Sequence, residues 1–325
     1  MTRKTGKQAF IDWTTEKTKN LLEASKSLIP ISDVHYPGHT WSIVKLLILS
    51  GWVYVYTTII PKHYKEYWYI DLLAGSGTTY VKETGDVVIG SPFIAHFFAY
   101  NQFTKYIYFE KNRRRYEALR RRASKLMGSK AVVINEDCNE AIREALPAKR
   151  NVHSLVFIDN EGFDVYWSTI STLLGYNTDI LIVFPTSSSV RPKSGLEKLK
   201  LFYRDLSWLR AQDKEEFLEA YMQQLGEEYR RLRRKEEYVS NIRVGSRQFY
   251  YDVILVCKKG PYIRAWEYFK GRLDWQNPAI IETTLDILHG RATRIDWFIG
   301  LQEEIASINR KMERKTQKSL EEFII

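Results

Sequence analysis

The segment 68–78, Trp-Tyr-Ile-Asp-Leu-Leu-Ala-Gly-Ser-Gly-Thr, constrains the fold of this chain more than any other part of it. Its first half is rich in strand-forming residues and contains Asp71, and its second half breaks into Ala74-Gly75-Ser76-Gly77. Because glycine has no Cβ, backbone N–H groups in such a turn can approach a ligand closely. The segment therefore predicts a strand, a glycine loop and a nucleotide-type binding site.

Length and composition allow either one large α/β domain with additions or two domains. Of the 325 residues, 44% are hydrophobic and 14% aromatic, so we expect a sizeable core and disorder only at the ends. The formal net charge of +10 has two interpretations, an acidic partner such as RNA or DNA, or general solubility. The two cysteines, Cys138 and Cys257, exclude a disulfide framework and a four-cysteine zinc site built by this chain alone, and we predict no metal site.

The N-terminal residues 1–23 are polar and charged, which is not the pattern of a signal peptide. The most apolar stretch, 46–60, is shorter than the roughly 20 residues that a membrane-spanning helix needs. We therefore expect a buried helix over 41–56, a cytoplasmic protein and no membrane partner.

Strands alternate with helices through the middle of the chain, which predicts an α/β fold with a doubly wound, mostly parallel sheet. The predicted strands are 67–73, 105–109, 131–134, 154–158, 179–184 and 248–256. The predicted helices between and after them are 93–100, 112–127, 139–146, 167–174 and 262–269. Residues 30–39 are predicted as a loop, and 79–90 as a polar, turn-rich insertion.

Three parts follow from this pattern. We expect N-terminal helices in an arm and lead-in helix over 1–66, and the sheet domain over 67–270, with a charged helical insertion at about 193–240. A helical C-terminal tail is expected over 271–325.

Acidic residues end four of the predicted strands: Asp71, Glu110, Asp137 and Asp159. In an open parallel sheet, ligands bind beyond the carboxyl ends of the strands. A single acid at such a place is usually a helix cap or a turn residue. Four of them in series with a glycine loop indicate a binding site along one edge of the sheet.

A nucleoside ligand assigns a role to each of these residues. Glu110 is expected to accept hydrogen bonds from both ribose hydroxyls, because an ionised carboxylate has two acceptor oxygens. Asp137 is expected to accept from the adenine amino group while the Cys138 N–H meets a ring nitrogen. The cofactor loop itself comprises Asp71 and the four residues Ala74, Gly75, Ser76 and Gly77.

Other nucleotide motifs fit less well. A dinucleotide fingerprint requires a third glycine where Tyr80 stands, and the chain has no Gly-x-x-x-x-Gly-Lys-Ser/Thr phosphate loop. The spacing from the loop to Glu110 is about twice the usual roughly 20 residues, and the insertion at 79–90 accounts for the difference. S-adenosylmethionine is therefore the cofactor that we predict.

Three motifs in order resemble the three-Cys-motif partner protein (TcmP) family: Tyr69-Ile-Asp-Leu-Leu-Ala-Gly-Ser-Gly77, Ile89-Gly-Ser-Pro92, and Val156-Phe-Ile-Asp159 with Gly162. The resemblance covers roughly 41–185, and more loosely 250–269 and Asp296-Trp297-Phe298. It implies a seven-stranded Rossmann-like methyltransferase fold of class I, with Asp71, Gly75 and Gly77 in the cofactor loop and Asp159 at the active-site edge. A separate three-Cys-motif protein is the partner that the family name implies.

The motif after the fourth strand departs from this family, because Asn160-Glu161 replaces a Pro-Tyr or Pro-Phe pair. Amino-group methyltransferases of nucleic acids carry an acid, two prolines and an aromatic ring that stacks on the flipped base. This chain keeps Asp159 and lacks the prolines and the ring, although Phe163 follows closely. Asp159 and Glu161 are the catalytic candidates, and Glu161 is either a general base or a surface turn residue.

Two arginine triplets, 113–115 and 120–122, recur seven residues apart, about two helical turns. The candidates for nucleic-acid contact are Arg113, Arg114, Arg120 and Arg121; the alternative is a solvated helix face. For the cluster at 230–235, with acids on both sides, the solvated face is favoured. Two functions stay open: a SAM-dependent methyltransferase acting on nucleic acid, or a catalytically inactive methyltransferase-like module that binds nucleic acid or a protein partner.

Overall fold

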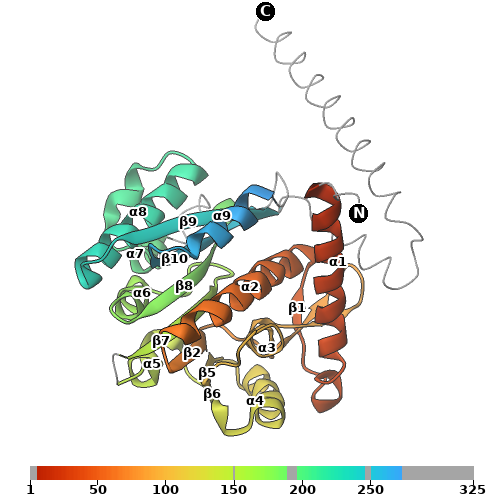
Figure 1. Ribbon diagram of the computed structural model, residues 1–325. Helices are drawn as coiled ribbons and strands as arrows, with labels where there is room; N and C mark the ends of the chain where they lie inside the picture. The colour runs from red at the N-terminus through yellow and green to blue at the C-terminus, as the bar shows by residue number, and fades with distance from the viewer. Residues whose placement is uncertain (1–5, 149–150, 189–195, 246–249, 273–325) are drawn as a thin grey trace, which may run out of the picture.

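The computed structural model describes residues 6–148, 151–188, 196–245 and 250–272 (Figure 1). Most of the predicted C-terminal tail, including Asp296-Trp297-Phe298, lies outside the described residues. So does the beginning of the strand that was predicted at 248–256.

A seven-stranded sheet forms the middle layer, with the strand order β6-β5-β2-β7-β8-β10-β9. Its strands are β2 (Glu66–Asp71), β5 (Lys105–Phe109), β6 (Ala131–Ile134), β7 (Val152–Asp159), β8 (Thr178–Phe184), β9 (Glu237–Gly245) and β10 (Tyr250–Lys258). Neighbours from β6 to β8 pair in parallel, whereas β10 pairs antiparallel with both β8 and β9. A mostly parallel seven-stranded sheet of this order is the Rossmann-like methyltransferase fold, and the predicted fold class is confirmed.

Helices cover both faces of the sheet (Figure 1). They are α1 (Gly6–Ser25), α2 (Thr40–Ile59), α3 (Ser91–Phe97), α4 (Arg113–Met127), α5 (Cys138–Ala145), α6 (Trp167–Leu174), α7 (Leu196–Phe202), α8 (Lys214–Arg233) and α9 (Ile263–Arg272). Short 3-10 helices occur at Ile29–Ile31, Ile60–Lys62, Gly128–Lys130, Thr186–Ser188 and Leu206–Arg210. The first four helices and α9 share one core cluster, and α5 to α8 share the other.

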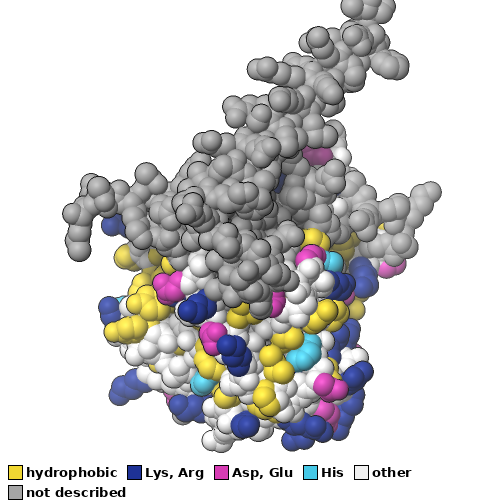
Figure 2. Space-filling model, turned by 90° about the vertical axis from the view of Figure 1, so that its right-hand side faces the viewer, with side chains coloured by type: hydrophobic (Ala, Val, Ile, Leu, Met, Phe, Trp, Pro, Cys, Tyr) yellow, Lys and Arg dark blue, Asp and Glu magenta, His cyan; other side chains and the backbone are white. Residues whose placement is uncertain are grey.

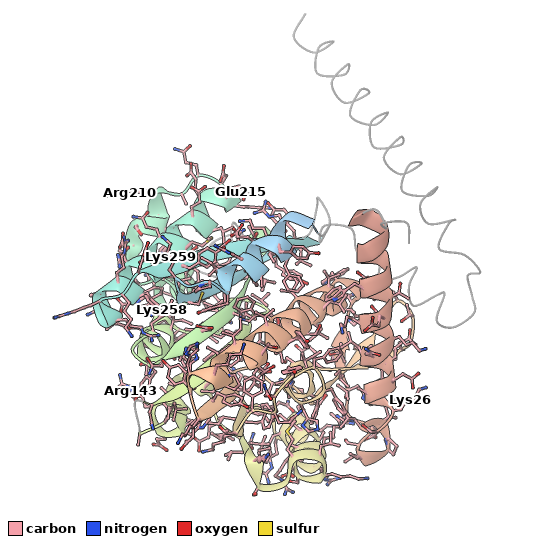
Figure 3. All side chains as sticks on the ribbon, viewed as in Figure 1. Lys26, Arg143, Arg210, Glu215, Lys258 and Lys259 are labelled. Atoms are coloured by element: carbon pink, nitrogen blue, oxygen red, sulfur yellow. The ribbon has the colours of Figure 1, made fainter. Side chains whose placement is uncertain are left out.

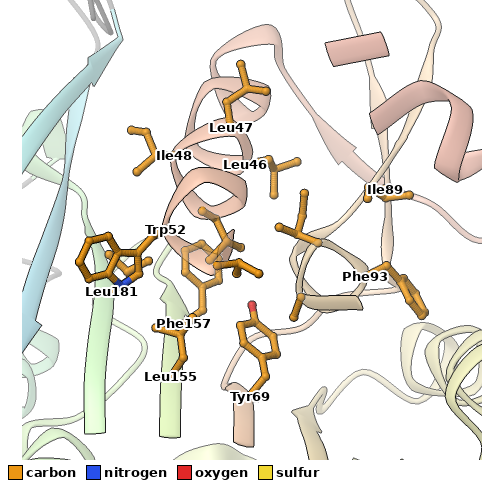
Figure 4. Close-up of a cluster of buried hydrophobic side chains, with 14 of the residues drawn as sticks. Leu46, Leu47, Ile48, Trp52, Tyr69, Ile89, Phe93, Leu155, Phe157 and Leu181 are labelled. Atoms are coloured by element: carbon orange, nitrogen blue, oxygen red, sulfur yellow. The ribbon is translucent and has the colours of Figure 1, made fainter. Parts of the chain in front are cut away.

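Alternation along the strands separates these two clusters, since successive side chains of a strand point to opposite faces. In Figure 4, Tyr69, Leu155 and Phe157 of the sheet lie beneath α2. Their neighbours Ile70 and Val156 face the opposite cluster. The face of the sheet to which each side chain near the carboxyl ends points is therefore fixed. This also determines the direction of the acidic residues that follow.

Helix α2 is the buried helix that the apolar stretch predicts. The segment Thr40–Lys62 is long and apolar enough to cross a membrane by length and composition alone, but 72% of its most apolar window is buried inside the protein. Leu47, Leu49 and Trp52 are fully buried, and Trp52 packs edge-on against Trp266 of α9. Helix α2 thus forms the centre of one core cluster.

A second, smaller sheet corrects two predictions. It has three strands in the order β1-β3-β4: β1 (Tyr36–Gly38), β3 (Thr78–Val81) and β4 (Val87–Ile89). The predicted loop at 30–39 thus contains a strand, and the predicted insertion at 79–90 is a hairpin that pairs with it. The first strand was not predicted because Pro37 argues against a strand. Proline is tolerated in a sheet mainly at an edge, which is where β1 lies.

The charged helical insertion is also corrected. Instead of one long helical region, α7, the 3-10 turn at Leu206–Arg210 and α8 follow one another, and the region ends before β9, a strand that was not predicted. Figure 3 shows the labelled Arg210 and Glu215 at the outer end of this helical layer. Arg230 pairs with Glu237 and Arg231 with Glu228, as expected for the solvated face that was favoured for the 230–235 cluster.

Candidate functional site

A cavity of about 720 Å³ lies beyond the carboxyl ends of β2, β5, β6 and β7. Of the residues predicted for the site, nine line it: Ala74, Gly75, Ser76, Gly77, Glu110, Asp137, Cys138, Asp159 and Glu161. The structure thus brings residues of both predicted sets, cofactor-binding and catalytic, to one cavity; Asp71 is the exception. Its volume is within the range of roughly 300–1,000 Å³ that is usual for small-molecule sites.

The glycine loop needs its glycines for two different reasons. Gly75 and Gly77 have φ angles of 62° and 83°, in the left-handed region that other residues avoid. A Cβ on Gly77 would also lie less than 3.0 Å from the ring of Phe93, a fully buried residue of α3. The Gly77 carbonyl accepts the Gly90 N–H at 2.8 Å, so the first two motifs of the sequence are in direct contact.

Asp71 lies behind this loop and does not line the cavity. Its carboxylate is fully buried and accepts hydrogen bonds from the Leu73 N–H at 3.3 Å, the Tyr69 hydroxyl at 3.4 Å and the Ser91 hydroxyl. Burial, opposed by the Ser91 hydrogen bond and reinforced by the charge of Asp159, raises the pKa of Asp71 to about 7. Asp71 therefore supports the loop from within the core.

This pKa predicts a pH-dependent stability. Between the ordinary pKa of 3.8 and the raised pKa of about 7, the folded state holds a proton that the unfolded state has lost, so stability falls as pH rises.

The substitution Asp71→Asn should remove this pH dependence of the free energy of unfolding. From pH 5 to pH 8 the wild type should lose about 2–3 kcal/mol more free energy of unfolding than the variant. Urea denaturation at both pH values measures the difference. Asp179, a second buried acid with a pKa raised by burial to about 7, is present in both proteins, so equal losses would contradict the assignment to Asp71.

Glu110 stands at the end of β5 and is almost buried, with 6% of its surface exposed. It accepts the Asn112 N–H at 2.7 Å and pairs with the Arg115 guanidinium at 3.1 Å. Both partners come from the start of α4 and hold the carboxylate at the cavity wall. Arg115 was predicted only as part of a helix surface, and the structure brings it into the site.

Asp137 serves as the N-cap of α5 as well as lining the cavity. One oxygen accepts the Asn139 N–H at 2.9 Å, while the other lies 3.5 Å from the Lys111 ammonium. Burial raises the pKa of the neighbouring Cys138 thiol to about 12, so this thiol stays protonated and is no nucleophile.

Each of the two catalytic candidates has a partner. Asp159 forms an ion pair of 2.5 Å with Lys45 of α2. Glu161, which is exposed at the rim, accepts a hydrogen bond from the Tyr36 hydroxyl, and the Arg115 guanidinium lies 5.1 Å from the centre of the Tyr36 ring. Burial and the proximity of Glu161 raise the pKa of Tyr36, so its hydroxyl remains the donor.

The predictions missed the side of the cavity that the N-terminal part of the chain contributes. Tyr36, His39, Trp41 and Lys45 line it, and the rings of His39 and Trp41 stack with centroids 4.2 Å apart and 11° between their planes. One signal was available: Lys45 is the single charged residue of α2. Phe163, by contrast, packs against Phe202 with ring centroids 4.9 Å apart and is not among the lining residues.

The arginine helix α4 shows two different faces. Arg113, Arg114, Arg120 and Arg121 are exposed and lie outside the cavity lining, and Arg113 and Arg120 both pair with Glu117. Arg115 and Arg122 point inward, so neither triplet lies wholly on a solvated helix face. On the face shown in Figure 2, Lys and Arg side chains are scattered along the lower edge, with acidic side chains among them.

Comparison with known proteins finds solved structures of low similarity and no family. No protein-family model and no curated protein matches the sequence. The chain is similar in structure to Trm1 from Pyrococcus horikoshii in complex with S-adenosyl-L-methionine, with 14% identity over 68% of this chain and 57% of that one and a TM-score of 0.41. An rRNA methylase from Streptococcus thermophilus (10% identity, 63% and 94%, TM-score 0.34) and a precorrin-6y C5,15-methyltransferase from Geobacter metallireducens (14%, 60% and 81%, 0.32) are also similar. At TM-scores below 0.5 these similarities carry no argument about function. The strand order and the cavity define the class of protein, one with a Rossmann-like methyltransferase fold.

Proposed function

We propose that the protein is a SAM-dependent methyltransferase. The observation that carries this proposal is that one cavity is lined by the glycine loop, Glu110, Asp137 and Asp159. The first three follow β2, β5 and β6, and Asp159 ends the neighbouring strand β7. The loop backbone would hold the amino-acid part of the cofactor, Glu110 the ribose and Asp137 the adenine.

The charges around the cavity support this cofactor over a phosphate-bearing one. Among the described lining residues, six are acidic: Glu110, Glu136, Asp137, Asp159, Glu161 and Asp164. Three are lysine or arginine: Lys45, Lys111 and Arg115. A lining with an excess of carboxylates attracts a positively charged sulfonium and repels the phosphates of a dinucleotide or a nucleoside triphosphate.

When bound, S-adenosylmethionine supplies an electrophilic methyl group. The chain's own contribution would be alignment, since holding the acceptor atom in line with that methyl group accounts for much of the rate of such a transfer. Asp159 would accept a hydrogen bond from the acceptor, and Lys45 fixes the orientation of this carboxylate from α2. Glu161, at the open rim, is placed to take up the proton that an amino or hydroxyl acceptor loses.

The acceptor that we propose is nucleic acid, and a cytoplasmic location is proposed with it. The exposed arginines of α4 support the acceptor, because Arg114 and Arg121 lie seven residues apart on one helix and Lys111 and Arg115 continue the basic residues to the cavity. A separate three-Cys-motif protein is a further proposed partner, and it rests on the three sequence motifs alone.

The second candidate function is a methyltransferase-like module that binds without catalysis. One observation favours it: both catalytic candidates already have partners, Asp159 in Lys45 and Glu161 in Tyr36. An acceptor would have to compete with these contacts. Cofactor binding is common to both functions, so only methyl transfer separates them.

Calorimetric titration and a transfer assay test the proposal together. We expect S-adenosylmethionine to bind, with NAD and ATP as controls that do not, and methyl transfer from labelled cofactor to RNA or DNA. Asp159→Asn should keep the cofactor affinity within about threefold and reduce transfer about 100-fold, because it removes a positioning carboxylate and leaves the loop intact. Absence of binding at millimolar S-adenosylmethionine would refute the proposal, and binding without any transfer would favour the non-catalytic module.

A further inference from the structure

Arg122 of α4 is completely buried, with 0% of its surface exposed. Its guanidinium donates to four backbone carbonyls: Leu28 at 3.2 Å, Ser32 at 2.5 Å, Val34 at 2.8 Å and Ser76 at 2.8 Å. Within the described residues it forms no ion pair with a carboxylate. Burial lowers the pKa of Arg122 to about 10, and the charge of Asp33 partly offsets this effect. Its hydrogen bonds in the described part of the chain all go to carbonyl oxygens.

Burial of a cation without a direct ion pair is unfavourable, and an aliphatic side chain would fill the same core position without this cost. What an aliphatic side chain cannot provide is the fork of donors, which reaches carbonyls in different directions. Three of the four carbonyls belong to residues 28–42, here termed the strap, and the fourth belongs to Ser76 of the cofactor loop, residues 74–77. Arg122 is the junction of these two segments.

The strap contributes residues to the part of the cavity where the acceptor would bind. Tyr36 and Trp41 belong to the strap and line the cavity, and the Tyr36 hydroxyl donates a hydrogen bond to Glu161. The strap also packs closely against the cofactor loop and the residue after it. A Cβ on Gly75 would lie 3.6 Å from the Tyr36 ring, and the His35 Nδ1 is 2.9 Å from the Thr78 hydroxyl. A shift of the loop therefore moves the residues that meet the acceptor.

We propose that Arg122 is a positioning residue that couples the cofactor loop to the strap, so that binding of the cofactor fixes Tyr36 against Glu161 and completes the acceptor half of the cavity. This inference rests on the proposed function. It gives a role to an arginine of the second triplet that no contact with a nucleic acid can explain, because its side chain has no exposed surface.

Hydrogen exchange measured by mass spectrometry tests the coupling, with peptides that cover 28–42 and 74–80. In the wild type, S-adenosylmethionine should slow exchange in both segments. In Arg122→Met the loop should still respond, whereas the strap should exchange about 10-fold faster in the free protein and no longer respond, because three of its hydrogen bonds are lost. Arg122→Lys, which keeps the charge but not the fork, should be intermediate, and it serves as the test if the methionine variant does not fold.

Arg121→Met is the matched control, since Arg121 is the exposed neighbour on the same helix, and it should behave as the wild type. Strap exchange in the Arg122 variants that equals the wild type, with the response to cofactor retained, would overturn the inference. Absence of any response to S-adenosylmethionine in the wild type would instead refute the proposed function. In that case the free-protein exchange rates still decide whether Arg122 holds the strap.

Discussion

Replacement of Gly77 by alanine should destabilise the protein by about 3 kcal/mol or more and abolish binding of S-adenosylmethionine. The φ angle of 83° is strained for any residue with a Cβ. The new methyl group would also lie less than 3.0 Å from the Phe93 ring and 3.1 Å from a methyl group of Leu119. Both neighbours are fully buried, so neither can move aside without disturbing the core.

Gly75→Ala is the matched control, because it adds the same atom to the same loop. Its φ angle of 62° is also positive, but the new Cβ would only touch the Tyr36 ring at 3.6 Å, an ordinary contact. We therefore expect a loss of about 1–2 kcal/mol from backbone strain alone. Urea denaturation of both variants measures the difference. If they lose equal stability, the packing of Phe93 against Gly77 is not what fixes the loop.

Glu110→Ala should weaken S-adenosylmethionine about 100-fold, the equivalent of about 2.7 kcal/mol. The carboxylate is nearly buried, and two charge-assisted hydrogen bonds to ribose hydroxyls would account for a loss of this size. The substitution also leaves Arg115 without its carboxylate, which adds a positive charge beside a cationic ligand. Calorimetric titration measures the affinity directly.

Glu117→Ala controls for a general change in charge on α4. Glu117 pairs with Arg113 and Arg120 on the outer side of the helix and does not line the cavity. Its removal should leave the affinity for S-adenosylmethionine within about twofold, because the ion pairs lie at the surface and outside the cavity. An unchanged affinity in Glu110→Ala would show that Glu110 does not hold the ribose.

Features with a local cause could be predicted from the sequence. The predicted strands 105–109 and 131–134 match β5 and β6, because short runs of strand-forming residues stand between turn signals. The glycine loop and the acids after the strands were found in the same way, since a parallel sheet brings all its carboxyl ends to one edge. Nine of the ten cofactor and catalytic candidates line the cavity for this reason.

Features that depend on contacts distant in sequence could not be predicted. Strand β1 forms only because it pairs with β3, and its own Pro37 argues against a strand. The ion pair of Lys45 with Asp159 joins α2 to β7, and no local sequence pattern predicts it. The inward direction of the Arg122 side chain could not be predicted from an arginine-rich helix sequence either, because it depends on carbonyls of the strap.

The most direct test of the central claim is a crystal structure of the protein with S-adenosylhomocysteine, the product of the proposed reaction. We expect ligand density at the 74–77 loop, with the ribose hydroxyls on Glu110 and the adenine beside Asp137 and Cys138. The sulfur of S-adenosylhomocysteine should face Asp159. The acceptor half of the cavity, between Tyr36, Trp41 and Lys45, should remain open. Density for the ligand elsewhere, or a cavity that stays without ligand at millimolar concentration, would contradict the account.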